Sequence, residues 1–235
     1  MRIFRFNEID STNDFLKRKE DQQEFDLAVA KVQTKGRGRR GNTWVSSQGM
    51  AMFSFLLKED EKISLEEYSK LPLVTGLAVL KGISRIENLD FKFKWTNDIY
   101  LNDKKLCGIL VEKVEEFFII GIGINVNNKE LGAVENTAVS LINETEKNYI
   151  IDDIIFTVLD EFKKQYSRFC CGEWDLILAE INSRNYLKSK EVYITGSNWD
   201  ILGQAGDIAP DGRLEVEVNG KKELFNIGEV HIKRG

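Results

Sequence analysis

The chain has 235 residues, of which 42% are hydrophobic and 30% charged, and its formal net charge is −5. This length allows one large domain, or one medium and one small, around a real core. An acidic chain is a poor general nucleic-acid binder, because Lys and Arg supply most of the affinity for phosphates. His231 is the single histidine, which argues against histidine-based zinc sites and Ser-His-Asp triads.

The thiols and the apolar runs indicate a cytoplasmic protein. Cys107, Cys170 and Cys171 are odd in number and two of them are adjacent, so they do not read as a disulfide framework. The longest apolar run, Phe117 to Ile124, is too short to cross a bilayer. Residues 1–15 carry charges throughout and lack the apolar stretch of a signal peptide. We therefore expect no membrane partner.

Strands and helices alternate in the first part of the chain. Apolar spacing predicts strands at Ile3–Phe6, Leu27–Val32 and Met52–Leu57, and helices at Asp14–Lys19 and Ser69–Ile86. The first of these helices follows a run of Asp, Ser, Thr and Asn, which are the preferred N-cap residues.

A β-rich block and two helices follow. We expect a strand at Phe91–Trp95, a hairpin of Leu106–Val114 with Phe117–Asn125, an irregular stretch at residues 127–149, and helices at Asp152–Phe169 and Trp174–Asn185. From Glu191 onward, short alternating stretches are separated by turn sequences, which predicts four or five strands of a small β-barrel. We place a domain boundary near residue 187, between residues 1–187 and 188–235.

The segment Thr34–Gly49 is long, polar and basic. Its centre, Gly36-Arg37-Gly38-Arg39-Arg40-Gly41, follows Lys35, so that four cations lie within six residues. Glycines allow close approach of the backbone to a ligand, and arginines bind phosphate or carboxylate bidentately. From the spacing alone, a solvated loop or an RNA-contacting segment is equally compatible.

Three other segments carry candidate chemistry, each with a plain structural alternative. Lys105 opens an apolar strand, where a cation is more often a simple strand-end charge. Gly121 and Gly123 leave one strand face bare, for close approach of a ring or for packing against a helix. The polar run Asp10–Asn13 caps a helix, and its hydroxyl and amide groups could also bind a small polar head group.

In this order and at these distances, the segments resemble the biotin protein ligases, also called biotin–acetyl-CoA-carboxylase ligases. The resemblance runs through Ser11-Thr12-Asn13, Gly36–Gly41 with Trp44 downstream, Lys94-Trp95-x-Asn97-Asp98, Lys105-Leu106-x-Gly108-Ile109-Leu110-Val111-Glu112 and Gly121-x-Gly123-Ile124-Asn125. It covers most of residues 1–128. It implies an α+β fold, with a central mixed β-sheet packed by helices as in class II synthetase-like domains, plus a small C-terminal SH3-like β-barrel.

The resemblance also implies a reaction and its residues. ATP and Mg²⁺ would activate biotin to biotinyl-5'-AMP, and biotin would then pass to a lysine of a biotin carboxyl carrier protein or domain. Lys105, Arg39 and Asp98 would be catalytic. Biotin would be bound by Ser11, Thr12, Asn13, Gln33, Gly36, Arg37, Arg39, Lys105, Gly108 and Leu110. The nucleotide would be bound by Arg37, Arg39, Arg40, Trp44, Asn97, Lys105 and Asn125. We expect no protein metal site and no tightly bound prosthetic group.

The chain departs from the family pattern at two positions. Thr96 stands where the family usually has proline, and Asn42 where it often has arginine. We expect the first to alter only the rigidity of a turn and the second to remove a cation from the nucleotide side. The chain begins almost at the first catalytic strand, so we expect no DNA-binding domain, no DNA partner and no repressor function. A monomer or weak homodimer is expected.

Three other functions fit the sequence less well. A lipoate ligase or octanoyl transferase shares the catalytic fold, but those families lack the Gly-Arg-Gly-Arg-Arg-Gly loop. An RNA-binding module would use this loop, but the acidic net charge and the lack of a second basic patch oppose it. A biotin-sensing repressor without ligase activity would need a DNA-binding domain.

Overall fold

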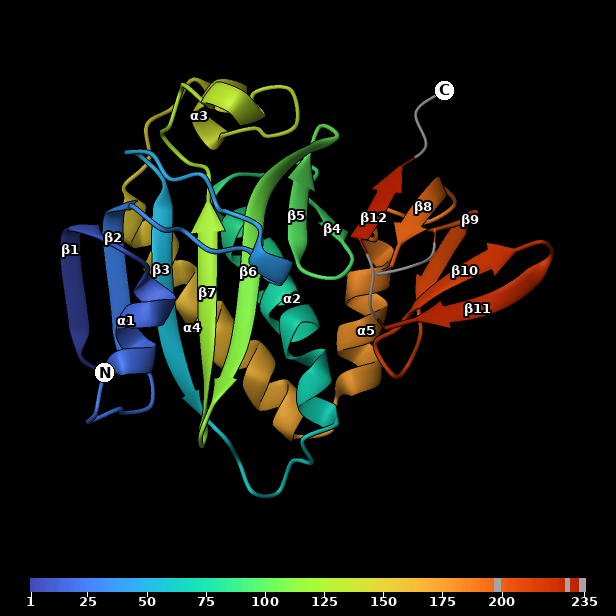
Figure 1. The fold of residues 1–235 in the computed structure, drawn as a ribbon, viewed down its shortest axis with the longest axis horizontal. Coiled ribbons are helices and arrows are strands. Elements are labelled where there is room, and N and C mark those ends of the chain that lie inside the picture. The colour runs from blue at the N-terminus through green and yellow to red at the C-terminus, as the bar shows by residue number, and fades with distance from the viewer. Residues whose placement is uncertain (197–199, 227–228, 233–235) are drawn as a thin grey trace.

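The computed structural model describes residues 1–196, 200–226 and 229–232. Its larger sheet has seven strands in the order β1-β2-β3-β7-β6-β5-β4 (Figure 1). Their bounds are β1 (Ile3–Ile9), β2 (Leu27–Gln33), β3 (Ala51–Lys58), β4 (Lys92–Lys94), β5 (Asp98–Leu101), β6 (Lys104–Val114) and β7 (Phe117–Ile124). The pair β1 and β2 is parallel and the other neighbours are antiparallel, so the sheet is mixed, as expected.

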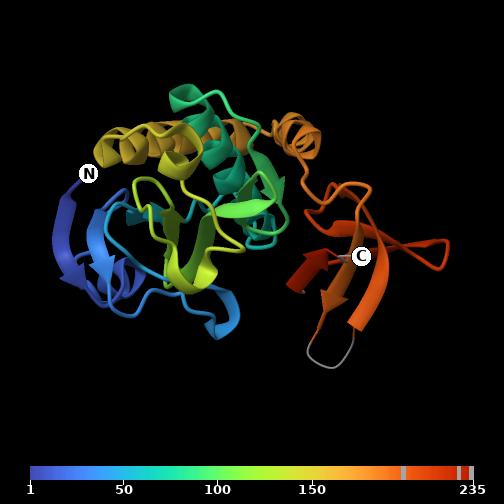
Figure 2. The ribbon, with the colours of Figure 1, turned by 90° about the horizontal axis from the view of Figure 1, so that it is seen from above.

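Helices lie on both faces of this sheet. One face is covered by α2 (Leu71–Ile86) and α4 (Ile151–Cys170), with α5 (Trp174–Ser183) beside them (Figure 2). Each carries an apolar stripe that is buried against the sheet or a neighbouring helix. The short helix α1 (Thr12–Arg18) lies against β2, β3 and β7 on the opposite face (Figure 1). This second face is left largely open, and the candidate site is built there.

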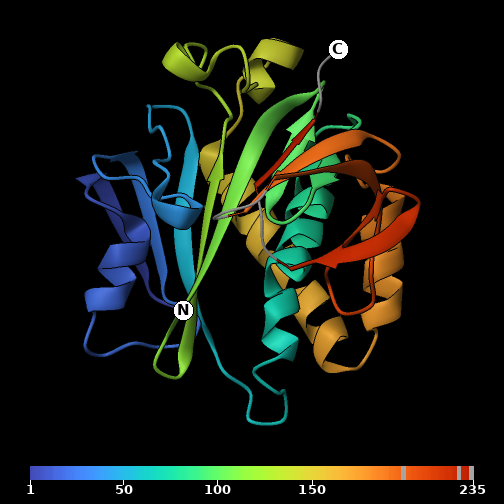
Figure 3. The same ribbon diagram turned by 45° about the vertical axis from the view of Figure 1, so that its right-hand side comes forward.

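The C-terminal part is a five-stranded antiparallel sheet in the order β11-β10-β9-β8-β12 (Figure 3). Its strands are β8 (Glu191–Thr195), β9 (Asp200–Ile208), β10 (Leu214–Val218), β11 (Lys221–Phe225) and β12 (Glu229–Ile232). The sheet fits the small C-terminal unit expected from the sequence. It is not a closed barrel, since β11 and β12 do not pair with each other within the described part of the chain.

The two sheets share one hydrophobic core. Leu187, Val192 and Ile194 belong to the same buried cluster as Phe53 and Phe162 of the larger unit. Two tryptophan side chains reinforce this contact by donating hydrogen bonds to one turn of the smaller sheet. Trp174 Nε1 donates to the carbonyl of Pro210 at 2.6 Å, and Trp95 Nε1 donates to that of Gly212 at 3.0 Å.

Most elements lie where the sequence pattern predicts them, with differences at short elements. The stretch 127–149 contains a short helix, α3 (Leu141–Thr145), whose first two residues are buried, and a 3-10 turn, η3 (Gly132–Val134). A further 3-10 turn, η2 (Glu67–Lys70), precedes α2, so the expected start at Ser69 belongs to this turn. Elements of three to five residues are too short to show a helical period. None of the helices in the described ranges combines the length and apolarity that a membrane span requires.

Candidate active site

A cavity of about 240 Å³ lies on the open face of the larger sheet, under the basic loop. Its floor is formed where β6 and β7 pair with Gly108 opposite Gly123 and Leu110 opposite Gly121. Successive residues of a strand point to opposite faces, and the isoleucines that alternate with the glycines of β7 are buried in the core. The same alternation that fills the core therefore leaves bare backbone under the cavity.

Side chains from the basic loop and from α1 pack directly against the glycines of this floor. A Cβ atom at Gly108 or Gly123 would lie 2.8 or 2.6 Å from the indole of Trp44, and one at Gly121 would lie 2.1 Å from Asn13 Oδ1. The glycine pair in β7 was interpreted as a place for close approach of a ring or as helix packing. In the structure both occur, since Gly123 faces the indole of Trp44 and Gly121 packs against Asn13 of α1.

The basic loop folds into a small hairpin over this floor. Arg37 and Thr43 form an antiparallel bridge, Gly38 N donates to Asn42 O at 2.7 Å, and Trp44 N donates to Gly36 O at 3.0 Å. At its tip lies the 3-10 turn η1 (Arg39–Gly41), seen in front of β6 in Figure 1. The tip crosses to the β4–β5 turn, where Arg39 Nη1 donates to Asn97 Oδ1 at 2.9 Å.

Neutral hydrogen-bonding groups gather at one end of the cavity. Ser11 caps α1, the backbone N of Thr12 donates to Gln33 Oε1 at 2.7 Å, and Thr12 Oγ1 lies 3.1 Å from the same oxygen. Thr12 Oγ1 also lies 2.6 Å from Ser54 Oγ, which is fully buried on β3. Ser54 was not predicted as a site residue. Its position as a polar residue within the apolar stretch of β3 was the one feature of the sequence that could have indicated a role in the site.

Charged groups gather at the other end. Lys105 Nζ lies 2.8 Å from Asp98 Oδ1 and 5.4 Å from the centroid of the Trp44 ring. The register of β5 and β6 places Asp98 opposite Gly108, which brings this carboxylate to the cavity floor. Within the described residues, the buried Trp44 Nε1 and Thr96 Oγ1 have no hydrogen-bond partner. Both atoms are available to a ligand.

The structure brings together most residues predicted for the site. The cavity is lined by Ser11, Thr12, Asn13, Gln33, Arg37, Arg39, Arg40, Trp44, Asn97, Asp98, Lys105, Gly108 and Leu110. Gly36 and Asn125 are not in its lining. Gly36 is buried where a Cβ would meet the Trp44 carbonyl oxygen at 2.4 Å, and Asn125 N donates to Leu106 O at 2.9 Å. Gly36 and Asn125 therefore contact the backbone of the loop and strand that line the cavity, not the cavity itself.

Some lining residues were not predicted. Lys94, Trp95 and Thr96 belong to a quoted motif but were given no role, and Asn42 and Thr43 lie in the basic loop. Val230 and His231 of β12 also line the cavity. Nothing in the sequence pairs β12 with this face, because the contact depends on how the smaller sheet docks.

Two groups in or near the site can be assigned by their environment. Burial raises the pKa of the Cys107 thiol far above its ordinary value, so Cys107 is no nucleophile at neutral pH. Burial alone would lower the pKa of Arg37, but hydrogen bonds and charge from Asp14 and Glu112 raise it. Arg37 is therefore a permanent cation.

The donor set suits an anionic ligand better than a metal held by protein alone. No group of three or more His, Cys, Asp or Glu side chains in the described ranges could hold a metal ion. The carboxylate in the cavity lining is that of Asp98. Mg²⁺ commonly binds one or two carboxylates together with substrate phosphates, and Asp98 fits that arrangement.

Comparisons with known proteins place the chain in a family. A sequence profile of the biotin/lipoate A/B protein ligase family matches residues 6–127. The bifunctional ligase/repressor BirA of Bacillus subtilis is 36% identical over 210 residues, which is 85% of this chain. The biotin–[acetyl-CoA-carboxylase] ligase of Mycobacterium tuberculosis is 27% identical over 231 residues, covering 95% of this chain and 86% of that protein.

The fold agrees with these matches. The structure of the biotin protein ligase from Aquifex aeolicus in complex with biotin and ATP superposes with a TM-score of 0.90 at 31% identity, covering 100% of this chain and 99% of that one. By contrast, the chain spans 64% of the length of the Bacillus subtilis relative. From the profile match and this likeness together, the chain belongs to the biotin/lipoate A/B protein ligase family.

Proposed function

We propose that this chain is a biotin protein ligase that activates biotin with ATP and transfers it to a lysine of a biotin carboxyl carrier protein or domain. The observation that carries the proposal is the polarity of the cavity. Neutral donors and acceptors around Thr12 and Gln33 lie at one end, and Lys105 and Asp98 lie at the other. Biotin has the matching form, with a neutral polar ring system at one end and a carboxylate at the other.

In the first step, a biotin carboxylate oxygen attacks the α-phosphorus of ATP, and pyrophosphate leaves. An anion must approach a polyanion, so fixed cations are needed where negative charge develops. Lys105, next to the glycine floor, would contact both the carboxylate and the α-phosphate. Arg39 and Arg40, at the tip of the basic loop, supply further positive charge above the floor.

Mg²⁺ would be held by Asp98 and by phosphate oxygens, and when bound it would supply additional charge neutralisation. The ion pair with Lys105 holds the Asp98 carboxylate at the same end of the cavity. Trp44 covers the glycine floor and is the candidate for the adenine side. Asn97 holds Arg39 and donates to the Ile109 carbonyl at 2.6 Å, which fixes the turn beside the nucleotide.

The closed hairpin of the basic loop would shield the mixed anhydride from water until a carrier docks. In the second step, the amine of the carrier lysine attacks the anhydride carbonyl and AMP leaves. Asp98 would orient this amine. Ser11, Thr12, Asn13, Gln33, Arg37, Gly108 and Leu110 would hold the biotin ring system and chain throughout, and Gly36 and Asn125 would support the frame.

We further propose that residues 1–187 carry catalysis and that residues 188–235 form a supporting unit. We also propose that the chain does not act as a repressor. The acidic net charge of −5 supports this, since specific DNA binding needs a concentrated basic surface.

The test compares substrates. The protein is incubated with ATP and Mg²⁺ and either biotin or lipoate, and pyrophosphate release is measured. Release that depends on biotin, followed by labelling of a purified carrier domain, is expected. Pyrophosphate release with lipoate but not with biotin would overturn the proposal in favour of a lipoate ligase. If neither acid causes pyrophosphate release, the proposed adenylation reaction is wrong. A gel-shift assay with promoter DNA at physiological salt tests for DNA binding, and a sequence-dependent shift would contradict the proposal that the chain is no repressor.

A further inference from the structure

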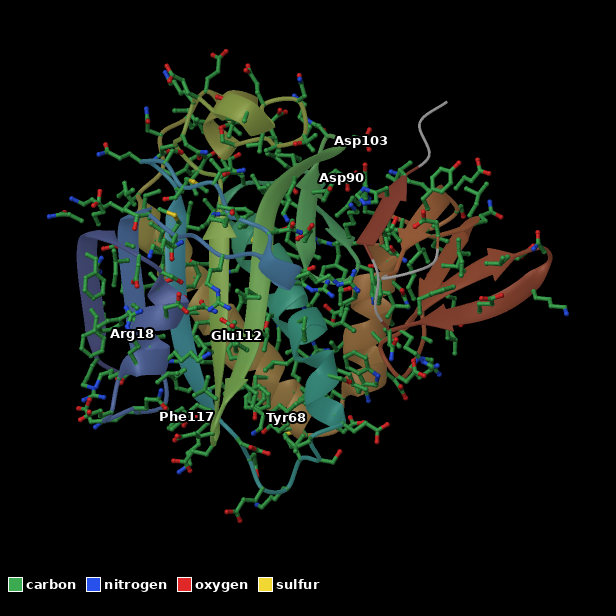
Figure 4. The ribbon with its side chains drawn as sticks, in the orientation of Figure 1. Arg18, Tyr68, Asp90, Asp103, Glu112 and Phe117 are labelled. Carbon is green, nitrogen blue, oxygen red and sulfur yellow. The ribbon has the colours of Figure 1, made fainter. Side chains whose placement is uncertain are left out.

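Arg37 stands at the base of the basic loop, and it is held by two carboxylates from different elements. Its Nη1 donates to Asp14 Oδ1 of α1 at 2.6 Å, and its Nη2 donates to Glu112 Oε1 of β6 at 2.8 Å. Neither carboxylate lines the cavity. Glu112 is labelled in Figure 4, where it lies at the level of α1. These two carboxylates therefore act on the loop and not on a ligand.

Glu112 has a second contact, with the first turn of α1 beside the neutral end of the cavity. Its Oε2 accepts a hydrogen bond from Asn13 Nδ2 at 2.9 Å, and Asn13 Oδ1 accepts one from Ser54 Oγ at 2.6 Å. Because Ser54 gives its one hydroxyl proton to Asn13, it accepts from Thr12 Oγ1, and the backbone N of Thr12 donates to Gln33. One hydrogen-bonded chain thus runs under the cavity from the neutral end to the base of the basic loop.

The members of this chain are shielded from water at its centre. Asn13 is 4% exposed and Ser54 is fully buried, whereas the side chain of Glu112 is 20% exposed. Buried polar networks fix geometry because each member loses a partner when a neighbour moves. A shift of the neutral end is therefore transmitted to Arg37 through Glu112.

We propose that Glu112, assisted by Asp14, is a positioning residue that clamps Arg37 and so fixes the base of the basic loop in register with the neutral end of the cavity. Its effect on biotin binding rests on the function proposed above, whereas its effect on the loop does not. The clamp therefore confines any movement of the loop to its tip around Arg39 and Arg40.

Both oxygens of Glu112 accept hydrogen bonds, which explains why a carboxylate is needed. A glutamine has one accepting oxygen, so it can keep either Asn13 or Arg37 but not both. Asn13 cannot compensate by turning its amide, because its Oδ1 already accepts from Ser54. Glu112→Gln is therefore a nearly isosteric change that weakens the clamp.

The first test needs no ligand. Limited trypsin digestion of the intact protein reports access to Lys35, Arg37, Arg39 and Arg40. Glu112→Gln and Asp14→Asn should each speed cleavage between residues 35 and 40 by about tenfold, since each loses a hydrogen bond to a charged group. The matched control is Glu59→Gln, which removes the carboxylate paired with Lys113, the next residue of β6. Equal cleavage rates in all four proteins would overturn the clamp.

The second test is a double-mutant cycle on biotin affinity, measured by calorimetry. Glu112→Gln should raise the Kd for biotin about tenfold. If Glu112 acts through Arg37, adding Glu112→Gln to Arg37→Met should change the Kd no further. Additive effects would mean that Glu112 has a separate structural role and would overturn the proposal. If the wild type does not bind biotin, the proposed function fails while the digestion test still decides on the clamp.

Discussion

Lys105 combines two contacts that a simple strand-end charge does not need. It forms an ion pair with Asp98 at 2.8 Å, and its ammonium lies 5.4 Å from the centroid of the Trp44 ring. Both partners belong to the cavity lining, and the Lys105 side chain is 32% exposed, so a substrate can reach it. An ammonium held in place before the substrates bind costs no reorganisation during reaction.

Lys105→Ala should lower the rate of biotin-dependent pyrophosphate release by about 10²–10³, the usual cost of removing one preorganised donor to a transition state. The fold should survive, because the side chain is partly exposed and its backbone bonds remain. The measurement is pyrophosphate release, with circular dichroism melting as the control for folding. If the folded variant releases pyrophosphate at a near wild-type rate, Lys105 is not catalytic and is a simple strand-end charge.

Asp26 is a residue whose charge matters for stability. It is fully buried, and Arg2 Nε donates to its Oδ1 at 2.8 Å. Burial alone would raise the pKa of Asp26, but the hydrogen bonds from Arg2 and from the backbone of Gln23 lower it below its ordinary value. Because the pKa of this carboxyl is lower in the folded state, the ionised Asp26 stabilises the fold at pH values above its pKa in the unfolded chain, which is near 4. This stabilisation is lost as the pH falls through the lower pKa of the folded state.

Asp26→Asn should therefore reduce the free energy of unfolding at pH 7 by about 1–3 kcal/mol, the usual cost of losing a hydrogen bond to a charged group, since the Arg2 side chain is 33% exposed. The difference from wild type should shrink as the pH is lowered from about 5 toward 2. Urea denaturation at several pH values measures it. Asp21→Asn is the control, because Asp21 pairs with the same Arg2 but its side chain is 71% exposed. A difference that stays constant with pH would contradict the assignment.

At the scale of elements, the first turn of α1 docks onto the sheet only because β7 offers bare backbone there. A Cβ at Gly121 would lie 2.1 Å from Asn13 Oδ1. Asn13 is held on its other sides by Ser54 and Glu112, so it has little freedom to move. The position of Thr12, and with it the neutral end of the cavity, depends on this fit.

Gly121→Ala should lower the free energy of unfolding by about 1–3 kcal/mol through overpacking and should also weaken biotin binding. The control is Gly206→Ala in β9, where the nearest atom to a new Cβ is Glu215 Cβ at 3.3 Å. Chemical denaturation and calorimetry with biotin separate the two effects. Loss of stability with unchanged biotin affinity would show that α1 does not position the neutral end.

Elements with a clear apolar period could be predicted from the sequence, and the contacts between them could not. The hairpin of β6 and β7 follows from the two apolar runs on either side of Glu115. The ion pair of Lys105 with Asp98 does not, because the register of β5 and β6 places Tyr100 opposite Lys105 and Gly108 opposite Asp98. Glu112 was quoted in a motif without a role. Its partner Asn13 is 99 residues away, and only the docking of α1 reveals the contact.

At the scale of the whole molecule, the smaller sheet is joined to the site rather than tethered beside it. Its strand β12 contributes Val230 and His231 to the cavity lining. Its turn around Pro210 and Gly212 receives hydrogen bonds from Trp174 and Trp95. Sequence spacing predicted the strands of this sheet, but docking depends on long-range packing that local patterns do not contain.

Trp95 links this turn to the cavity, because it lines the cavity together with Thr96, Asn97 and Asp98, which follow it in the chain. Trp95→Phe should remove its hydrogen bond to Gly212 and leave that carbonyl unpaired, at a cost of about 1–3 kcal/mol in unfolding free energy. The β4–β5 turn should then be less well fixed, so we expect the KM for ATP to rise by roughly an order of magnitude.

The matched control for Trp95→Phe is Trp174→Phe, which removes the hydrogen bond to Pro210 in the same turn. Trp174 lies on α5 and outside the cavity lining, so this variant should lose similar stability without a change in KM. Urea denaturation and steady-state kinetics of pyrophosphate release measure both quantities in both variants. If the two variants shift the KM for ATP equally, the effect comes from loosening the smaller sheet as a whole and Trp95 has no special place in it. If neither shifts it, the smaller sheet supports the fold but not the nucleotide end of the cavity.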